Sequence, residues 1–339
     1  MIPSKAGAKD NHDREGWLLF SKRKVAKDDL LTIRRQDVED ARLIREHSME
    51  RGTFVRFRDS SLIATLGCAL LFGLTACGGG GGGSGVVAPL IPSTTQPATP
   101  PPATARTESD SIKSAQTGAT YQLAIYLPAS YGGNTKAYPV IYALDGDAVN
   151  PPSGRFENLK TILERKGIDA ILVGIGGTAR RSTDYTLPGA VPYHDFLTKE
   201  LVPFVEAKYR TDKAKRILTG HSLSGSMTGY VLFMEGASTD LTFSHFLSFD
   251  GSYGFQQAET ESLEQKMYDV RKEKTLPATL ILARCSDTTQ CNYQPVGAIY
   301  QKPQQRGYAG FEVVEKTYST SHMAIDPAAF DDAIAMVFR

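Results

Sequence analysis

Few residues in this sequence are of the kind that build metal sites. Its 339 residues include four cysteines and six histidines, and neither a Cys-x-x-Cys nor a His-Glu-x-x-His spacing occurs. These absences argue against a bound metal ion. The formal net charge is only +1, and no basic stripe is interleaved with aromatic side chains. We therefore expect neither a metal site nor a nucleic-acid-binding surface.

The sequence also lacks an apolar run of membrane-spanning length near its start. The run 62-LIATLGCALLFGLTA-76 is shorter than the about 20 residues that a spanning helix needs, but it fits the apolar core of a secretory signal. It ends in 74-LTAC-77, followed by six glycines. Leu, two small residues and Cys resemble the lipobox of bacterial lipoproteins. That resemblance implies that Cys77 is acylated and is the first mature residue.

Met49 offers a start for this signal, because 49-MERGTFVRFRDSS-61 supplies a basic segment ahead of the apolar run. We expect residues 49–76 to be a lipoprotein signal peptide and residues 1–48 to be a mis-assigned or disordered extension. The alternative is a cytosolic amphipathic segment before an uncleaved anchor.

Gly, Pro, Ser and Thr dominate residues 77–110, and no apolar periodicity occurs there. Such a segment has too few apolar side chains to offset the entropy of ordering it, which favours a flexible and then polyproline-like tether. A tether after a lipidated cysteine would hold a folded domain off a membrane. We therefore expect a cell-envelope protein that faces the periplasm or the cell surface.

Only Cys285 and Cys291 lie in the remaining part of the chain. In an oxidising compartment two cysteines at this spacing can close a small disulfide loop. Two buried free thiols are the alternative, and the spacing alone does not decide between them.

Residues 111–339 alternate between strand-like and helix-like apolar patterns. Several strand candidates are continuously apolar, as parallel strands buried on both faces are. This alternation predicts one α/β domain with a mainly parallel sheet. The strand candidates are 121–128, 138–144, 169–175, 216–220, 244–249, 278–283 and 311–318, and the helix candidates are 194–209, 223–235, 257–274 and 323–338.

The segment 216-RILTGHSLSG-225 nearly matches the nucleophile elbow Gly-x-Ser-x-Gly of serine hydrolases. An apolar strand leads into it and an apolar helix follows, which is the context that the elbow needs. Ser222 is the predicted nucleophile. Ser224 stands where the second glycine belongs, and Gly225 arrives one residue late. We interpret Ser224 as an exchange of one small residue for another.

A serine nucleophile needs a base and a group that orients the base. In α/β-hydrolases the chain order is serine, acid, histidine. His322 follows the last predicted strand and is the candidate base. Asp287, after the penultimate strand, fits the usual place of the acid, and Asp250, after the strand before that, is the rival. Either aspartate could instead cap its own turn.

The oxyanion of the tetrahedral intermediate needs backbone N–H donors. We assign one donor to Leu223, which follows the nucleophile, and the second to Gly146 or Asp147 in the turn after an early strand. The run 174-GIGGTA-179 is similar to a dinucleotide-binding turn. A loop follows it where that site needs a helix, so we expect no nucleotide cofactor.

The pieces YPVIYALDGD, AILVGIGGTARRSTDYTLPG, RILTGHSLSG and TSHMAID resemble the putative esterase (esterase D-like) family of α/β-hydrolases, which includes siderophore esterases of the ferric enterobactin type. The resemblance runs from about residue 119 to the end. It implies a serine hydrolase with Ser222 and His322 as its catalytic pair and a weak or absent third member. The segment 248-SFDGSYG-254 departs from the Ser-Pro-Ser of many members.

The same resemblance implies that Arg181 and Tyr185 lie close to the active site as substrate-binding residues, where Arg181 would bind an anionic catecholate or carboxylate. An ordinary exposed arginine is the alternative. The leading hypothesis is a cell-envelope serine esterase that acts on a small-molecule, siderophore-like ester. The alternatives are an acyltransferase or a polysaccharide-linked ester deacylase on the same fold, and a non-catalytic surface binding protein.

Overall fold

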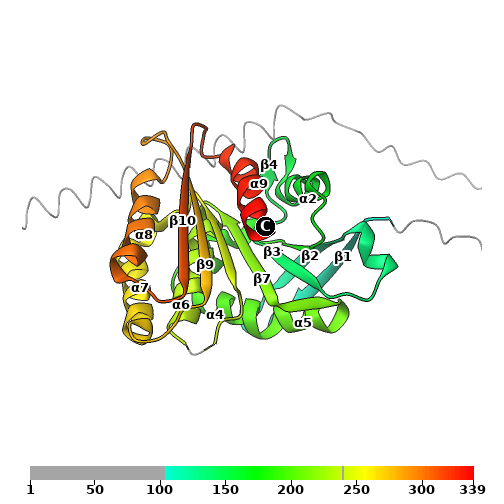
Figure 1. The fold of residues 1–339 in the computed structure, drawn as a ribbon, viewed down its shortest axis with the longest axis horizontal. Coiled ribbons are helices and arrows are strands. Elements are labelled where there is room, and N and C mark those ends of the chain that lie inside the picture. Colours follow the sequence, from blue (N-terminus) through cyan, green and yellow to red (C-terminus); the bar gives the residue numbers. More distant parts are fainter. Residues whose placement is uncertain (1–103, 239) are drawn as a thin grey trace, which may run out of the picture. The chain divides into compact units, whose positions relative to one another are not determined.

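The protein is represented by a computed structural model that describes residues 104–238 and 240–339 (Figure 1). The predicted signal peptide, Cys77 and the tether up to residue 103 lie outside the described residues. Within the described part, no helix is long and apolar enough to cross a membrane.

An eight-stranded sheet forms the centre of the domain, in the order β1-β2-β6-β3-β7-β8-β9-β10. The six strands from β6 to β10 in this order run parallel, and β1 and β2 are antiparallel additions at one edge. The prediction of a mainly parallel α/β sheet is therefore confirmed. The strands are β1 (Arg106–Lys113), β2 (Thr120–Leu127), β3 (Tyr138–Ala143), β6 (Ile171–Ile175), β7 (Thr211–His221), β8 (His245–Phe249), β9 (Ala278–Cys285) and β10 (Phe311–Tyr318).

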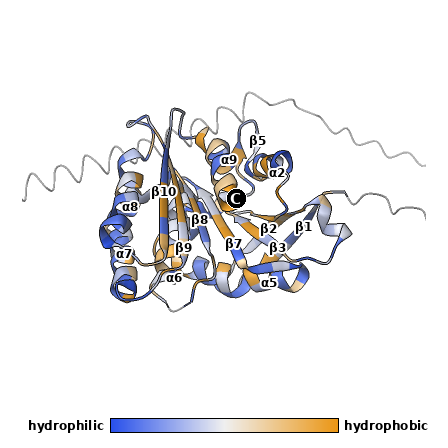
Figure 2. Ribbon diagram, in the orientation of Figure 1, coloured by the Kyte–Doolittle hydropathy of each residue, from blue (hydrophilic) through white to orange (hydrophobic). Residues whose placement is uncertain are grey.

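Helices cover both faces of this sheet and bury two apolar clusters (Figure 1). One face is covered by α2 (Arg155–Lys166) and α9 (Ile325–Val337), which also contact each other. Apolar residues gather along the central strands, whereas α7 is largely polar outside (Figure 2). The opposite face carries α4 (Ala190–Asp195), α5 (Val202–Lys208), α6 (Leu223–Gly236), α7 (Gln257–Arg271) and α8 (Tyr293–Arg306).

One predicted boundary is wrong, and one predicted helix is irregular. The expected tether reached residue 110, but Arg106–Lys113 pairs along its whole length with β2. Backbone hydrogen bonds hold this polar edge strand, so its lack of apolar side chains did not prevent pairing. The predicted helix 194–209 is interrupted by a π-helical turn at Phe196–Leu201, between α4 and α5.

Every loop that matters for the site leaves the sheet at the same edge. In a parallel sheet the carboxyl ends of the strands meet there, and ligands bind outside those ends. The segments after β3, β6, β7, β8, β9 and β10 are therefore neighbours, although nearly 180 residues separate the first from the last.

Candidate active site

Ser222 lies in a strained turn between β7 and α6. Its backbone has φ 62° and ψ −123°, a left-handed conformation that is costly for a residue with a Cβ. The turn is held on the β8 side, because the Ser222 amide donates to the Phe249 carbonyl at 3.0 Å. The Ser222 hydroxyl is partly exposed and lies 3.4 Å from the hydroxyl of Ser252. These are the features of a nucleophile elbow.

The glycines of the elbow stand where the chain is most crowded. A Cβ at Gly220 would lie 2.0 Å from the Ser224 carbonyl oxygen, and one at Gly225 would lie 2.9 Å from that of Phe249. The displaced Gly225 therefore allows α6 to approach the end of β8. Its position one residue late has a packing reason.

Ser224 does more than fill a small space. Its buried hydroxyl accepts a hydrogen bond from the His221 amide at 2.9 Å and donates one to the His221 carbonyl at 2.9 Å. The side chain thus closes the turn around the nucleophile. A glycine at this position would leave both buried backbone groups without that partner.

His322 is oriented by Asp250. Nδ1 of His322 lies 2.5 Å from Oδ2 of the fully buried Asp250. Because a carboxylate can only accept, Nδ1 carries the proton and Nε2 remains free to accept another. The imidazole is about one-fifth exposed, so this nitrogen is open to a reacting group. The pair has the geometry of the acid and base of a catalytic triad.

Asp287, the acid that the usual strand order favoured, is engaged elsewhere. Its Oδ1 accepts from the amides of Thr289 and Gln290 and from the Thr289 hydroxyl. These bonds lower the pKa of the Asp287 carboxyl. The structure thus pairs His322 with Asp250, and Asp287 is the cap of its own turn.

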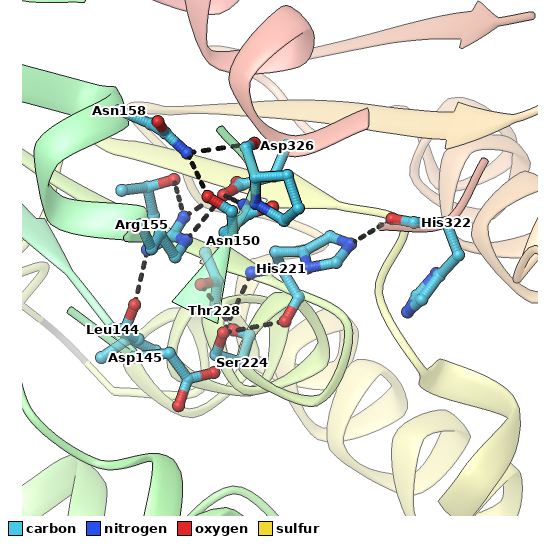
Figure 3. A network of polar contacts seen from close by, with 12 residues as sticks. Leu144, Asp145, Asn150, Arg155, Asn158, His221, Ser224, Thr228, His322 and Asp326 are labelled. Carbon is cyan, nitrogen blue, oxygen red and sulfur yellow. Dashed lines mark hydrogen bonds and ion pairs between the residues drawn. The ribbon is translucent and has the colours of Figure 1, made fainter. Parts of the chain in front are cut away.

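A second histidine, His221, also contacts His322. The Nε2–H of His221 donates to the His322 backbone carbonyl at 2.7 Å, and the two ring centroids are 4.7 Å apart (Figure 3). Burial first, and then the neighbouring His322 charge, lowers the pKa of His221 to about 4. No sequence pattern singled out His221, which fixes the loop that carries the base.

A buried ion pair holds the chain just after His322 (Figure 3). Asp326, at the start of α9, accepts from Arg155 Nε and from the Asn150 side chain, each at 2.9 Å. Arg155 also donates to the Leu144 carbonyl, at the end of β3. All of these side chains are at most 3% exposed. This network joins α2, α9 and the hairpin formed by β4 (Val149–Asn150) and β5 (Ser153–Gly154). No sequence motif predicted it.

Gly146 and Asp147 were the two candidates for the second oxyanion donor; Gly146 is wrong, and the Asp147 amide stays a prediction. The Gly146 amide donates to the Ile175 carbonyl at 2.8 Å and is therefore occupied. The Asp147 carboxylate accepts from the Gly177 amide and from Thr178, so this side chain braces the loop after β6. Leu223 is the first residue of α6, where amides lack intrahelical acceptors, which leaves its N–H suited to an oxyanion.

Arg181 lies beside the elbow but is already paired. Its Nε is 2.9 Å from Oδ2 of the buried Asp145, and its Nη2 donates to the His221 carbonyl at 3.4 Å. Burial raises the pKa of Asp145, and the Arg181 charge opposes that rise. The Arg181 side chain is 30% exposed, so one edge remains open to a ligand.

Tyr185 is not a surface residue of the site. It is fully buried, and its hydroxyl accepts from the Asp145 amide at 3.3 Å. Direct contact with a substrate is therefore excluded, and the prediction for Tyr185 needs correction: this side chain supports the turn after β3.

Cys285 and Cys291 are joined in a disulfide. Their sulfurs and a carboxylate oxygen of Asp250 lie within 4.8 Å of one another. Because the thiolates are consumed in the disulfide, this cluster is not a metal site.

The domain is similar in sequence to known esterases. Residues 114–231 match the family described as Putative esterase. The ferri-bacillibactin esterase BesA of Bacillus subtilis (strain 168) is 28% identical over 158 residues, which make up 38% of this chain and 54% of the relative. The chain thus spans about half the length of that relative.

Several solved structures share the fold of this domain. An IroE-like serine hydrolase from Shewanella oneidensis has a TM-score of 0.58 at 23% identity, over 68% of this chain and 79% of the other. The BES protein from Bacillus cereus gives 0.57 at 20% identity, covering 68% and 94%. Siderophore hydrolase EstA from Aspergillus nidulans gives 0.57 at 18% identity, covering 68% and 93%. These likenesses show an α/β-hydrolase fold.

Proposed function

We propose that this chain, whose residues 114–231 match the esterase family named above, is a serine carboxylic-ester hydrolase. The observation that carries the proposal is the 2.5 Å contact between His322 and the buried Asp250, in a chain that also holds Ser222 in a strained elbow. Strain of this kind and a buried acid behind a partly exposed imidazole cost stability, and they cluster at catalytic sites.

The proposed reaction follows from these roles. Ser222 Oγ attacks the ester carbonyl carbon while Nε2 of His322 takes its proton. Asp250 stabilises the resulting imidazolium, and the Leu223 amide donates to the oxyanion. The intermediate collapses, the alcohol leaves with the proton from His322, and Ser222 stays acylated. Water then attacks the acyl-enzyme in the same way, which releases the carboxylic acid and restores the serine.

A siderophore-like ester is the substrate class that we propose. Support comes from the relatives, one of which is named for ferri-bacillibactin and another as a siderophore hydrolase. The open edge of Arg181, beside the elbow, suits an anionic group on the substrate.

We further propose that the enzyme is a lipoprotein of the cell envelope, anchored through Cys77 and facing the periplasm or the cell surface. The lipobox-like 74-LTAC-77 and the Gly- and Pro-rich residues after it support this location. A disulfide in the domain fits an oxidising compartment.

Hydrolysis assays test the activity. Wild-type protein should hydrolyse p-nitrophenyl acetate and ferri-bacillibactin, and the Ser222→Ala variant should lose several orders of magnitude in kcat. An acyltransferase would instead transfer the acyl group to an added alcohol in preference to water. A binding protein would retain the ferric ligand without cleaving it, and Ser222→Ala would leave that binding unchanged.

A further inference from the structure

Asp250 is an unusual residue on which to rest a catalytic base. Its backbone has φ 43°, in the left-handed region, and it is fully buried. Its Oδ2 faces His322, whereas its buried Oδ1 has no hydrogen-bond partner among the residues that the structure describes. Both the backbone and the carboxylate rotation therefore depend on what surrounds them.

Asn292 supplies two of those surroundings. Its side-chain amide donates to the Asp250 carbonyl at 2.8 Å, and its backbone amide points to Oδ2 at 3.3 Å. The first contact fixes the left-handed backbone. The second directs Oδ2, and not Oδ1, toward the imidazole.

The position of Asn292 is itself fixed by a disulfide on one side and a hydrogen bond on the other. The preceding residue, Cys291, is bonded to Cys285 at the end of β9, and Sγ of Cys285 lies 3.3 Å from Oδ2 of Asp250. On the other side, Arg284 donates to the Tyr293 carbonyl at 2.9 Å. The loop after β9 is thus attached to its strand immediately before and after Asn292.

We propose that Asn292, held by the Cys285–Cys291 disulfide, is a positioning residue for Asp250, a proposal that rests on the proposed function. The loop after β9, which usually carries the acid itself, here braces an acid that comes from β8. Asn292 touches no reacting atom and acts only through Asp250, whose backbone its side chain holds and whose carboxylate its backbone amide orients.

The Asn292→Ala variant removes the side-chain bond and leaves the fold's apolar contacts in place. Its kcat for p-nitrophenyl acetate should fall about 3- to 10-fold, the value of one hydrogen bond, with KM little changed. Thr289→Ala is the matched control, because it removes a side-chain hydrogen bond in the same loop, and the Thr289 hydroxyl donates to Asp287. In an Asp250→Ala background, Asn292→Ala should have no further effect on kcat.

A second readout does not need activity. The Nδ1 proton of His322, shared with Asp250, should give a far-downfield proton NMR signal that broadens or shifts in Asn292→Ala and not in Thr289→Ala. If Asn292→Ala does not fold, dithiothreitol on the folded wild type tests the same brace. It exchanges the disulfide for two thiols and one cyclic dithiothreitol disulfide, and the same signal should change.

The outcomes separate the two proposals. A wild-type protein that neither hydrolyses esters nor labels at Ser222 contradicts the proposed function, whatever the NMR signal does. An active wild type whose kcat and downfield signal are equal in Asn292→Ala and Thr289→Ala overturns the positioning role. The positioning role is also overturned if Asn292→Ala lowers kcat as much in the Asp250→Ala background as it does in the wild type.

Discussion

Asp250 and His322 meet at 2.5 Å across the carboxyl edge of the sheet, although the acid follows β8 and the histidine follows β10. The strand between them, β9, carries Asp287 in its loop, and Asp287 is engaged in its own turn. The triad geometry therefore uses the strand adjacent to the elbow strand. This segment, 248-SFDGSYG-254, is the one that departs from the Ser-Pro-Ser pattern of the family that the sequence resembles.

Replacing Asp250 and Asp287 with alanine, one at a time, should separate their roles. Asp250→Ala should lower kcat for p-nitrophenyl acetate by about three orders of magnitude, because the imidazolium loses its stabilising charge and orientation. Asp287→Ala, the matched control, should stay within about 2-fold of wild type. Equal losses in both variants, or a loss only in Asp287→Ala, would contradict the assignment.

Restoring the glycine of the elbow pattern should weaken the protein. Ser224→Gly removes the hydroxyl that satisfies both the amide and the carbonyl of His221, at a cost of about 1–3 kcal/mol in the free energy of unfolding. Ser224→Ala keeps the Cβ and isolates the hydroxyl. Urea unfolding measures both variants. A Ser224→Gly variant as stable as wild type would show that these bonds contribute nothing.

The fold was predictable because its signals are local. Continuous apolar runs predicted β3, β6 and β9. The strand–turn–helix context identified Ser222 as the candidate nucleophile despite the displaced glycine. Helices α2 and α8 were not predicted, although Phe156, Leu159, Ile162 and Leu163 in α2 form an apolar stripe. Two prolines within α8 conceal it from a propensity argument.

The site was less predictable, because its contacts join residues far apart in the chain. The choice between Asp250 and Asp287 depends on which carboxylate reaches the imidazole, and strand order alone gave the wrong preference. The Gly146 amide, an assigned oxyanion donor, is instead bonded to the Ile175 carbonyl at the end of β6. The pairing of Arg155 with Asp326 spans 171 residues and has no sequence signature.

His221 should make stability fall in mild acid. Burial lowers its pKa to about 4, whereas the unfolded chain takes up a proton below about pH 6.5. The unfolded state therefore binds more protons in this window, and His221 costs about 2 kcal/mol of stability between pH 7 and pH 5. His221→Gln can still donate to the His322 carbonyl and should lose this dependence. Urea unfolding of both proteins at the two pH values measures it, and equal slopes would contradict the account.

Glu235 should act in the opposite direction. Burial raises its pKa to about 7, although the Thr242 and Phe243 amides oppose the rise. The folded state therefore keeps a proton that the unfolded state releases above about pH 4.5, and stability falls as the pH rises toward 7. Glu235→Gln should gain about 3 kcal/mol relative to wild type between pH 4.5 and pH 8. A stability difference that does not change with pH would contradict the buried, protonated carboxyl.

Labelling with a fluorophosphonate probe tests the central claim most directly, because the probe reacts only with an activated serine. Intact-mass and peptide analysis of wild type should find one adduct, on Ser222. Labelling should be absent in Ser222→Ala and strongly slowed in His322→Ala and Asp250→Ala, but unchanged in Asp287→Ala. Folded wild type that takes up no probe, or an adduct on another serine, would contradict a hydrolase built on Ser222, His322 and Asp250.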